Sequence, residues 1–147
     1  MTKKLIPHCV LCILATSTGL HAINWNSAAT DGDWNTPSSW DGGVVPTASD
    51  DAQINRTTNV TVSAAAFTNK LRSGHNSTIT VSTGGTLTVT TDAEVGNTGN
   101  AAENTAEGTL VVDGGSVAIT GKLFLGRYND TRNGTVTLNS GDISVGS

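Results

Sequence analysis

The side chains that could carry acid–base chemistry are few in most of this chain. His75 is the single histidine beyond residue 21. A metal centre built on imidazoles needs several histidines, and a Ser-His-Asp triad would have to use His75. Serine and aspartate are so abundant here that their presence beside one histidine indicates no triad. We therefore predict no catalytic residues and a protein that is not an enzyme.

Two pairs of aspartates offer the chemistry of a calcium site. They are Asp31 with Asp33, and Asp50 with Asp51. Carboxylates and loop carbonyls are the ligands that Ca²⁺ prefers, but Asp31-Gly32-Asp33 is too short to form an EF-hand loop. Aspartate is also a common turn former. We favour turn formation, and Ca²⁺ is the one cofactor that the sequence leaves open.

Basic residues gather near one predicted loop. Lys122, Arg127 and Arg132 lie close in sequence to Asp113 and Asp130. This group could bind an acidic sugar, although an ordinary salt-bridged surface is the favoured interpretation. The basic residues are thus candidate ligand contacts.

All three tryptophans lie in one irregular segment near the N-terminus. Trp25, Trp34 and Trp40 fall within residues 23–50, which are rich in the turn formers Asp, Asn, Gly and Ser. The indole rings could stack on sugar rings and are candidate ligand contacts. We favour another role, in which they cover the open end of a repetitive fold, because such folds need atypical terminal units.

A short phrase recurs in the part of the chain that must position these residues. It reads Gly85-Thr86-Leu87-Thr88-Val89, then Gly108-Thr109-Leu110-Val111-Val112, then Gly134-Thr135-Val136-Thr137-Leu138. A glycine turn followed by two apolar residues that face inward, repeated many times, is typical of the coils of a β-solenoid.

Triplets such as Val60-Thr61-Val62 explain how such coils would stack. The outer two side chains point to one face of a strand and the middle one to the other, so Val60 and Val62 enter the core and Thr61 faces water. We predict an all-β protein. Its fold is a right-handed parallel β-helix of about three to four coils over residues 51–147, behind a capping segment at residues 23–50. A β-sandwich is the alternative, because it also has many short alternating strands.

The N-terminus has the layout of a secretory signal peptide. Lys3 and Lys4 precede a mostly apolar run from Leu5 to Leu14, and Ala22 ends a plausible cleavage site. Cleavage there would remove both cysteines and leave six basic against twelve acidic residues, a net charge of −6. We predict a secreted or cell-surface protein with no membrane span. The acidic balance argues against nucleic acid as a partner.

The first part of the mature chain resembles a known family. Trp25, Trp34-Asn35, Ser39-Trp40, Pro46 and Asp50-Asp51-Ala52 look like the start of secreted bacterial proteins with autotransporter-associated β-strand repeats, including those with PEP-CTERM sorting tails. The Gly-Thr-Leu phrases resemble the repeats that follow. The resemblance implies a bacterial extracellular β-helix at the cell surface and implies no catalytic residues. Neither the membrane-inserting barrel nor the sorting tail of such proteins falls within these 147 residues.

These observations favour a non-enzymatic scaffold, such as a stalk, an adhesin or a matrix protein. Its partners would be polysaccharide or other surface proteins. Two longer insertions, Asn97–Glu107 and Arg127–Asn133, are the expected contact loops. The repeats stop part-way through a coil near Ser147, and an open coil edge is a template for self-association. The alternatives are the first segment of a polysaccharide-active β-helix enzyme and a carbohydrate-binding module.

Overall fold

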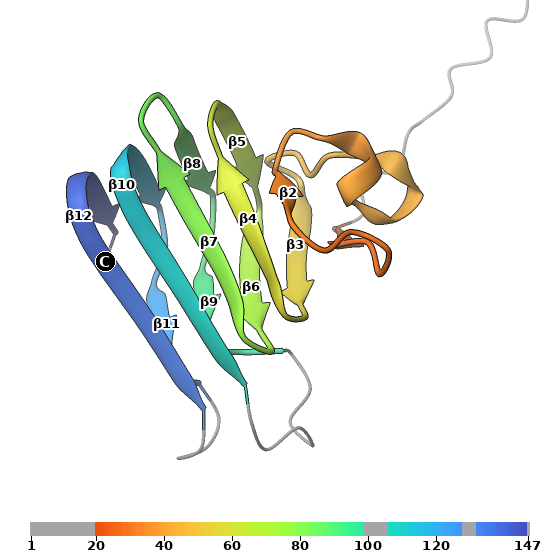
Figure 1. Cartoon of the computed structure of the whole chain (residues 1–147). Coiled ribbons are helices and arrows are strands. Elements are labelled where there is room, and N and C mark those ends of the chain that lie inside the picture. The colour runs from red at the N-terminus through yellow and green to blue at the C-terminus, as the bar shows by residue number, and fades with distance from the viewer. Residues whose placement is uncertain (1–19, 99–105, 128–131, 147) are drawn as a thin grey trace, which may run out of the picture.

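The computed structural model describes residues 20–98, 106–127 and 132–146. This part of the chain is all-β apart from two short 3-10 helices, η1 (Pro37–Ser39) and η2 (Asp41–Gly43) (Figure 1). The expected signal peptide lies almost wholly outside the described residues. The strands are β1 (His21–Asn24), β2 (Gly32–Asp33), β3 (Asp50–Asn55), β4 (Thr58–Val62), β5 (Ala65–Thr68), β6 (Lys70–Gly74), β7 (Ser77–Ser82), β8 (Thr86–Val89), β9 (Ala93–Val95), β10 (Glu107–Ile119), β11 (Leu123–Leu125) and β12 (Asn133–Val145).

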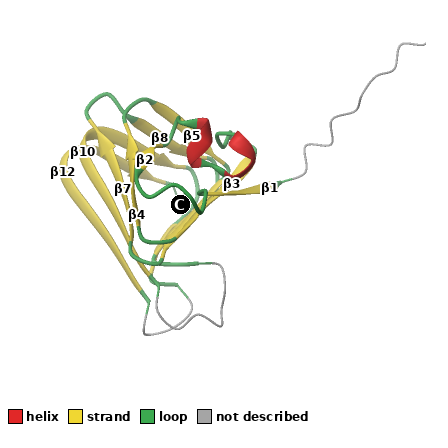
Figure 2. Ribbon diagram, turned by 45° about the vertical axis from the view of Figure 1, so that its right-hand side comes forward, coloured by secondary structure: helices red, strands yellow, loops and turns green. Residues whose placement is uncertain are grey.

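The strands form two sheets, and every pair of named strands is parallel. The five-stranded sheet has the order β1-β3-β6-β9-β11. The seven-stranded sheet has the order β2-β4-β7-β10-β8-β5, and β12 pairs with β10 beside it. The second sheet curls strongly, so that β5 and β8 fold back behind β4 and β7 (Figures 1 and 2). The prediction of an all-β chain with parallel sheets is confirmed.

The order of strands repeats along the chain. We use the word circuit for one pass over the two sheets: β3 to β5, then β6 to β8, then β9 with β10, then β11 with β12. Each strand pairs with its counterpart in the next circuit; for example, Gly108 and Leu110 of β10 lie opposite Gly134 and Val136 of β12. The strands β1 and β2 add a partial circuit by pairing with β3 and β4.

The triplets explain why these residues form strands around one core. In Val60-Thr61-Val62 and in Ile79-Thr80-Val81 the first and third side chains are at most 1% exposed and lie in the core. The middle threonines lie on the solvent side of the sheet. The same alternation holds for Leu87-Thr88-Val89. β-branched residues suit such half-buried strands. The predicted inward and outward faces of these triplets are confirmed.

The three recurring phrases do not all occupy equivalent positions in the circuits. The Gly108 and Gly134 phrases do lie opposite each other, but Thr86 of the Gly85 phrase lies opposite Ser116, in the second half of β10. The Gly85 phrase is therefore not equivalent to the other two. The sequence does not delimit β6, because this segment has a single large apolar residue, Leu71, at the core.

Glycines make the corners within the two longest strands. Gly114 in β10 and Gly141 in β12 have φ values of 88° and 96°, which side chains with a Cβ rarely adopt. Up to Gly114 β10 pairs with β7, and from Ser116 it pairs with β8, so β10 turns here from one half of the curled sheet to the other, and β12 follows it. One strand therefore supplies two sides of a circuit.

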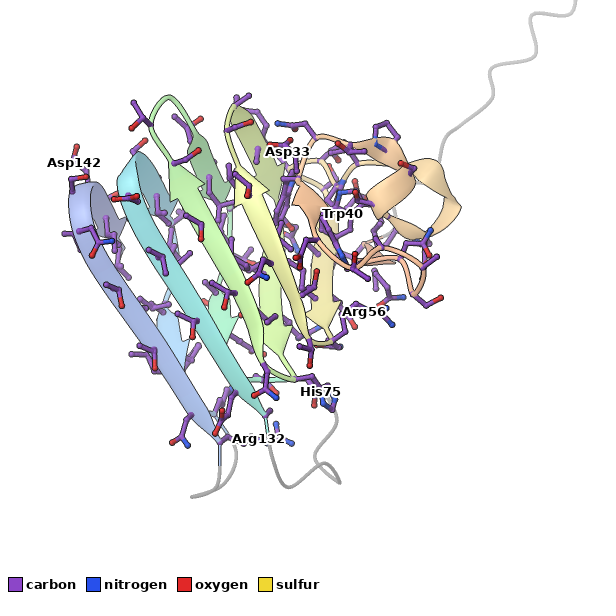
Figure 3. The ribbon with its side chains drawn as sticks, in the orientation of Figure 1. Asp33, Trp40, Arg56, His75, Arg132 and Asp142 are labelled. Carbon is purple, nitrogen blue, oxygen red and sulfur yellow. The ribbon has the colours of Figure 1, made fainter. Side chains whose placement is uncertain are left out.

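The three tryptophans close the N-terminal end of the core. The ring of Trp40 meets those of Trp25 and Trp34 edge-on, with centroids 5.0 and 4.9 Å apart. The Trp40 indole nitrogen donates a hydrogen bond of 2.7 Å to the Trp34 carbonyl oxygen. Figure 3 shows Trp40 inside this segment, between the helical turns and the first strands. We call these three residues the tryptophan cap.

Candidate functional site

The most strongly charged site lies on the outer face of the five-stranded sheet. Glu94, at the middle of β9, is 1% exposed although its neighbours Ala93 and Val95 already fill the core side. Its carboxylate lies 3.3 Å from Lys70 Nζ, 3.3 Å from Arg72 Nε and 2.6 Å from Arg127 Nη1. We call Glu94 and these three cations the Glu94 cluster.

Strand register brings these residues together. Arg72 of β6, Glu94 of β9 and Phe124 of β11 occupy one column across the sheet. The neighbouring strands lie roughly 4.8 Å apart, so opposite charges in one column meet directly. Arg127, two residues after β11, folds back so that its guanidinium carbon lies 4.4 Å from the centroid of the Phe124 ring. A cation over an aromatic face is attracted to it.

Two more side chains attach a neighbouring segment to this cluster. The Asn97 amide donates to Glu94, and Arg132 Nη1 donates to Asn97 Oδ1 at 2.8 Å. Arg132 is 4% exposed and also approaches the Arg127 carbonyl oxygen at 3.5 Å. The stems of both predicted insertions, at Asn97 and at Arg127, therefore meet over β9. Figure 3 shows Arg132 at the end of the sheets far from Asp142.

Opposing effects set the protonation of Glu94. Burial by itself raises the pKa of a carboxyl group, because the charged form loses water. The positive charges of Lys70, Arg72 and Arg127 outweigh this effect and hold the pKa of Glu94 below its ordinary value. Glu94 is thus a carboxylate at neutral pH, and its main chemical role is to hold cations in place.

Removal of this carboxylate should destabilise the protein and change its acid stability. Breaking a buried ion pair costs about 3–5 kcal/mol, and the partly exposed cations place Glu94→Gln near the lower end. Because the folded pKa is lowered, the contribution is present above the unfolded pKa of about 4.3 and is lost as pH falls toward the folded value. Urea unfolding between pH 7 and pH 3 measures both effects.

The pH dependence of unfolding is compared between the wild type and Glu94→Gln. We expect the free energy of unfolding of the wild type to fall below about pH 4.3, and that of Glu94→Gln to fall less steeply over the same range. Equal slopes for the two proteins would mean that other carboxylates dominate acid unfolding. Equal stabilities at pH 7 would mean that the ion pairs contribute nothing.

The basic residues singled out in the sequence meet only in part. Arg127 and Arg132 come together beside Asn97. Lys122 is exposed, its backbone N–H donates to Asp92 Oδ1 at 2.9 Å, and among the described residues its ammonium group forms no ion pair. Asp113 lies at the Gly114 corner, and Asp130 is outside the described residues.

Sequence reasoning missed the centre of the site, namely Lys70, Arg72 and Glu94. The available signal was the charged residue between the two small apolar residues of Ala93-Glu94-Val95. This signal was not sufficient, because the segment that faces the triplet, with Lys70 and Arg72, could not be delimited as a strand from the sequence.

The tryptophans lie in the core, with 2%, 0% and 0% of Trp25, Trp34 and Trp40 exposed. Their positions fit the favoured capping role, and a sugar could stack on them only if the cap opened. Two hollows flank the cap. One of about 390 Å³ is lined by residues 28–32, 36, 38 and 39, and one of about 200 Å³ by residues 24, 25, 27, 41, 53, 55 and 56.

The paired aspartates are engaged in local hydrogen bonds. Asp31 Oδ1 accepts from the Asn59 backbone at 2.6 Å, and Asp33 accepts from the Asn35 backbone at 2.8 Å. Asp50 accepts from the Thr47 backbone at 2.9 Å. Asp51 Oδ1 accepts from the Asn69 amide at 2.8 Å. Such bonds are those of turn formers and strand ladders. Within the described ranges no group of three or more His, Cys, Asp or Glu side chains could hold a metal ion.

His75 lies in the tight turn between β6 and β7. It and Asn76 have φ values of 53° and 60°, and its carbonyl oxygen accepts a hydrogen bond of 3.1 Å from the Thr57 hydroxyl. Asparagine and histidine tolerate such conformations better than most residues. The position explains His75 as a turn residue at the same end of the molecule as Arg132 (Figure 3).

Comparison of the chain with profiles of known protein families, with curated proteins and with solved structures finds no match. The resemblance to proteins with autotransporter-associated repeats therefore stays a prediction. Over residues 20–98, 106–127 and 132–146, no helix is long and apolar enough to cross a membrane.

Proposed function

We propose that the chain is a right-handed parallel β-helix and works as a non-enzymatic scaffold outside the cell or on its surface. The repeated circuits and their parallel register support the fold. Crossovers between parallel strands are right-handed in about 98% of cases, which supports the hand. A β-sandwich is built on antiparallel pairs, and in the described residues antiparallel pairing is limited to one isolated bridge between Trp25 and Trp40.

The observation that carries the functional proposal is the stacking of circuits on one core that the tryptophan cap closes at its N-terminal end. Leu125, Leu138 and Val145 of the last circuit are 50%, 53% and 46% exposed. The residues opposite Leu125 and Leu138 in the preceding circuit, Val95 and Val112, are 0% exposed. A further layer of strands would bury this face in the same way. An arrangement that is capped at one end and extendable at the other suits a stalk, an adhesin or a matrix protein.

The last circuit also supports association with other chains. Within the described residues β11 pairs with β9 and β12 pairs with β10, each on one side, and a strand edge that is left without a partner promotes association. We propose self-association or contact with other surface proteins at this end. Secretion, cleavage near Ala22 and a bacterial source belong to the same proposal and rest on the sequence alone.

The proposal is tested by locating the protein on the producing cells. Antibody labelling of intact cells should detect it without permeabilisation, and N-terminal sequencing of the labelled protein should begin near Ile23. A cytoplasmic protein probed in parallel controls for cell leakage. Labelling that requires permeabilisation, or a mature chain that still begins at Met1, would contradict a surface or extracellular role.

A further inference from the structure

Register and burial place an array of threonines on the outer face of four strands, which lie at the front of Figure 1. These strands are β4, β7 and the first halves of β10 and β12. Register places the outward residues in two columns. We call this surface the threonine face; its columns are Asn59, Thr78, Thr109, Thr135 and Thr61, Thr80, Val111, Thr137.

The hydroxyl groups of this face are available to a ligand. All six threonines are half-buried or exposed. Within the described part of the chain, none of their side chains takes part in a hydrogen bond, whereas buried threonines at strand ends, such as Thr58 and Thr68, bond to backbone oxygens.

On these four strands neither column contains a charged residue. The acids lie at the rim of the face: Asp33 of β2 is next to Thr61, and Glu107 and Asp113 are at the two adjoining outward positions of β10. The face therefore differs from the outer face of the five-stranded sheet, with its Glu94 cluster.

The spacing of this array is fixed by β-structure. Alternate residues along a strand lie roughly 6.6 Å apart, and neighbouring strands lie roughly 4.8 Å apart. The array is therefore a two-dimensional lattice of hydroxyl and methyl groups. Threonine is stiff at χ1, so these groups keep fixed directions at a small entropic cost.

We propose that the threonine face binds ice. Hexagonal ice repeats along its two principal axes with spacings of the same size as those of the array, so hydroxyls in both columns can meet lattice positions at once. The threonine methyl groups fill the spaces between these hydroxyls. They displace water that is less ordered than the ice lattice. The eight positions of the array are uncharged, which matters because an ion orders water around itself rather than in the lattice.

Ice is favoured over a sugar polymer as the ligand, because the threonine face lacks the side chains that bind sugars. None of its eight positions is aromatic, and no acid, base or carboxamide other than Asn59 lies in the columns. Protein sites for sugars depend on stacking and on convergent polar groups in a hollow. A flat lattice of small hydroxylated side chains has neither feature, but it gains from many weak contacts made together.

The test compares the growth of ice in solutions of the purified protein and two variants. Thr80→Tyr places a bulky ring at the middle of the threonine face. Thr88→Tyr is the matched control, because Thr88 lies on β8 between Phe67 and Ala118 on another face. We expect the wild type and Thr88→Tyr to facet single ice crystals and slow recrystallisation. Thr80→Tyr should need at least roughly tenfold more protein for the same effect.

Three outcomes would overturn the proposal: wild-type protein that leaves ice crystals as round discs, equal losses in both variants, or retention on crystalline chitin or cellulose without any effect on ice. Circular dichroism melts establish that each variant is folded. If Thr80→Tyr does not fold, Thr135→Tyr on the exposed last strand takes its place, with the same expectation of weakened ice binding.

Discussion

Replacement of Gly85 by alanine is expected to abolish the folded state. A Cβ atom at Gly85 would lie 2.0 Å from the Val62 carbonyl oxygen, 2.9 Å from the Val62 carbonyl carbon and 3.0 Å from the Ser82 carbonyl oxygen. All three are backbone atoms. Val62 cannot move aside, because it pairs with Val81 of the next circuit. We expect a cost well above the roughly 1–3 kcal/mol of ordinary overpacking.

The control is a glycine whose surroundings are empty. Gly42 has a φ of 74°, and no atom lies within 4 Å of the place that a Cβ would take, so Gly42→Ala tests backbone strain without a clash. That strain costs about 1–2 kcal/mol. Thermal unfolding followed by circular dichroism should give a cooperative transition for Gly42→Ala and none for Gly85→Ala. Similar melting curves would show that the close approach of the two circuits at Gly85 can relax.

The strands were predictable because their pattern is local. Alternation of inward and outward residues over three positions, as in Ile79-Thr80-Val81, needs no knowledge of the rest of the chain. The burial of the tryptophans was predictable for a similar reason. Three large apolar rings in one turn-rich segment are expected to pack together against the end of the core. Both inferences use composition and period alone.

Register could not be predicted in the same way. In β6 the core position after Leu71 is occupied by Ser73, which is 0% exposed. In β5 the core position after Ala66 is occupied by Thr68, which is also 0% exposed. Thr68 is tolerated there because its hydroxyl donates to the Asp50 carbonyl oxygen at 2.7 Å and accepts from the Ala52 N–H at 3.0 Å. Polar residues at core positions hide a strand from any search for apolar triplets. The bounds of β6 therefore could not be read from the sequence, although the later apolar triplets pair from circuit to circuit, as in Ile79 opposite Leu110.

The candidate site could not be predicted in full, because its contacts depend on the strand register. Lys122, Arg127 and Arg132 were grouped because they are close in sequence. Glu94, the carboxylate that Arg127 contacts, is more than thirty residues away and meets Arg127 only because β9 and β11 are neighbours. The uncharged lattice of the threonine face likewise exists only after the strands are aligned. Sequence reasoning identified outward threonines without showing that they form columns.

Replacement of Trp40 by alanine is expected to open the N-terminal end of the core. Trp40 is 0% exposed and contacts both other rings of the tryptophan cap, so the change leaves a large cavity. Trp→Ala changes in cores cost about 3–5 kcal/mol, a large share of the roughly 5–15 kcal/mol that stabilises a domain. We expect a lower urea midpoint and loss of the near-ultraviolet dichroism of the packed indoles.

Milder variants separate the cavity from the hydrogen bond. Trp40→Phe removes the 2.7 Å bond to the Trp34 carbonyl, whereas within the described residues the Trp34 indole nitrogen has no partner to lose. Leaving a buried acceptor unpaired costs about 1–3 kcal/mol, so Trp40→Phe should be less stable than Trp34→Phe. Val44→Ala, at a side chain that is 53% exposed, should change little. If Trp40→Ala unfolds at the same urea concentration as Val44→Ala, the tryptophan cap does not stabilise the stack. If Trp40→Phe and Trp34→Phe are equally stable, the cap is held by packing alone.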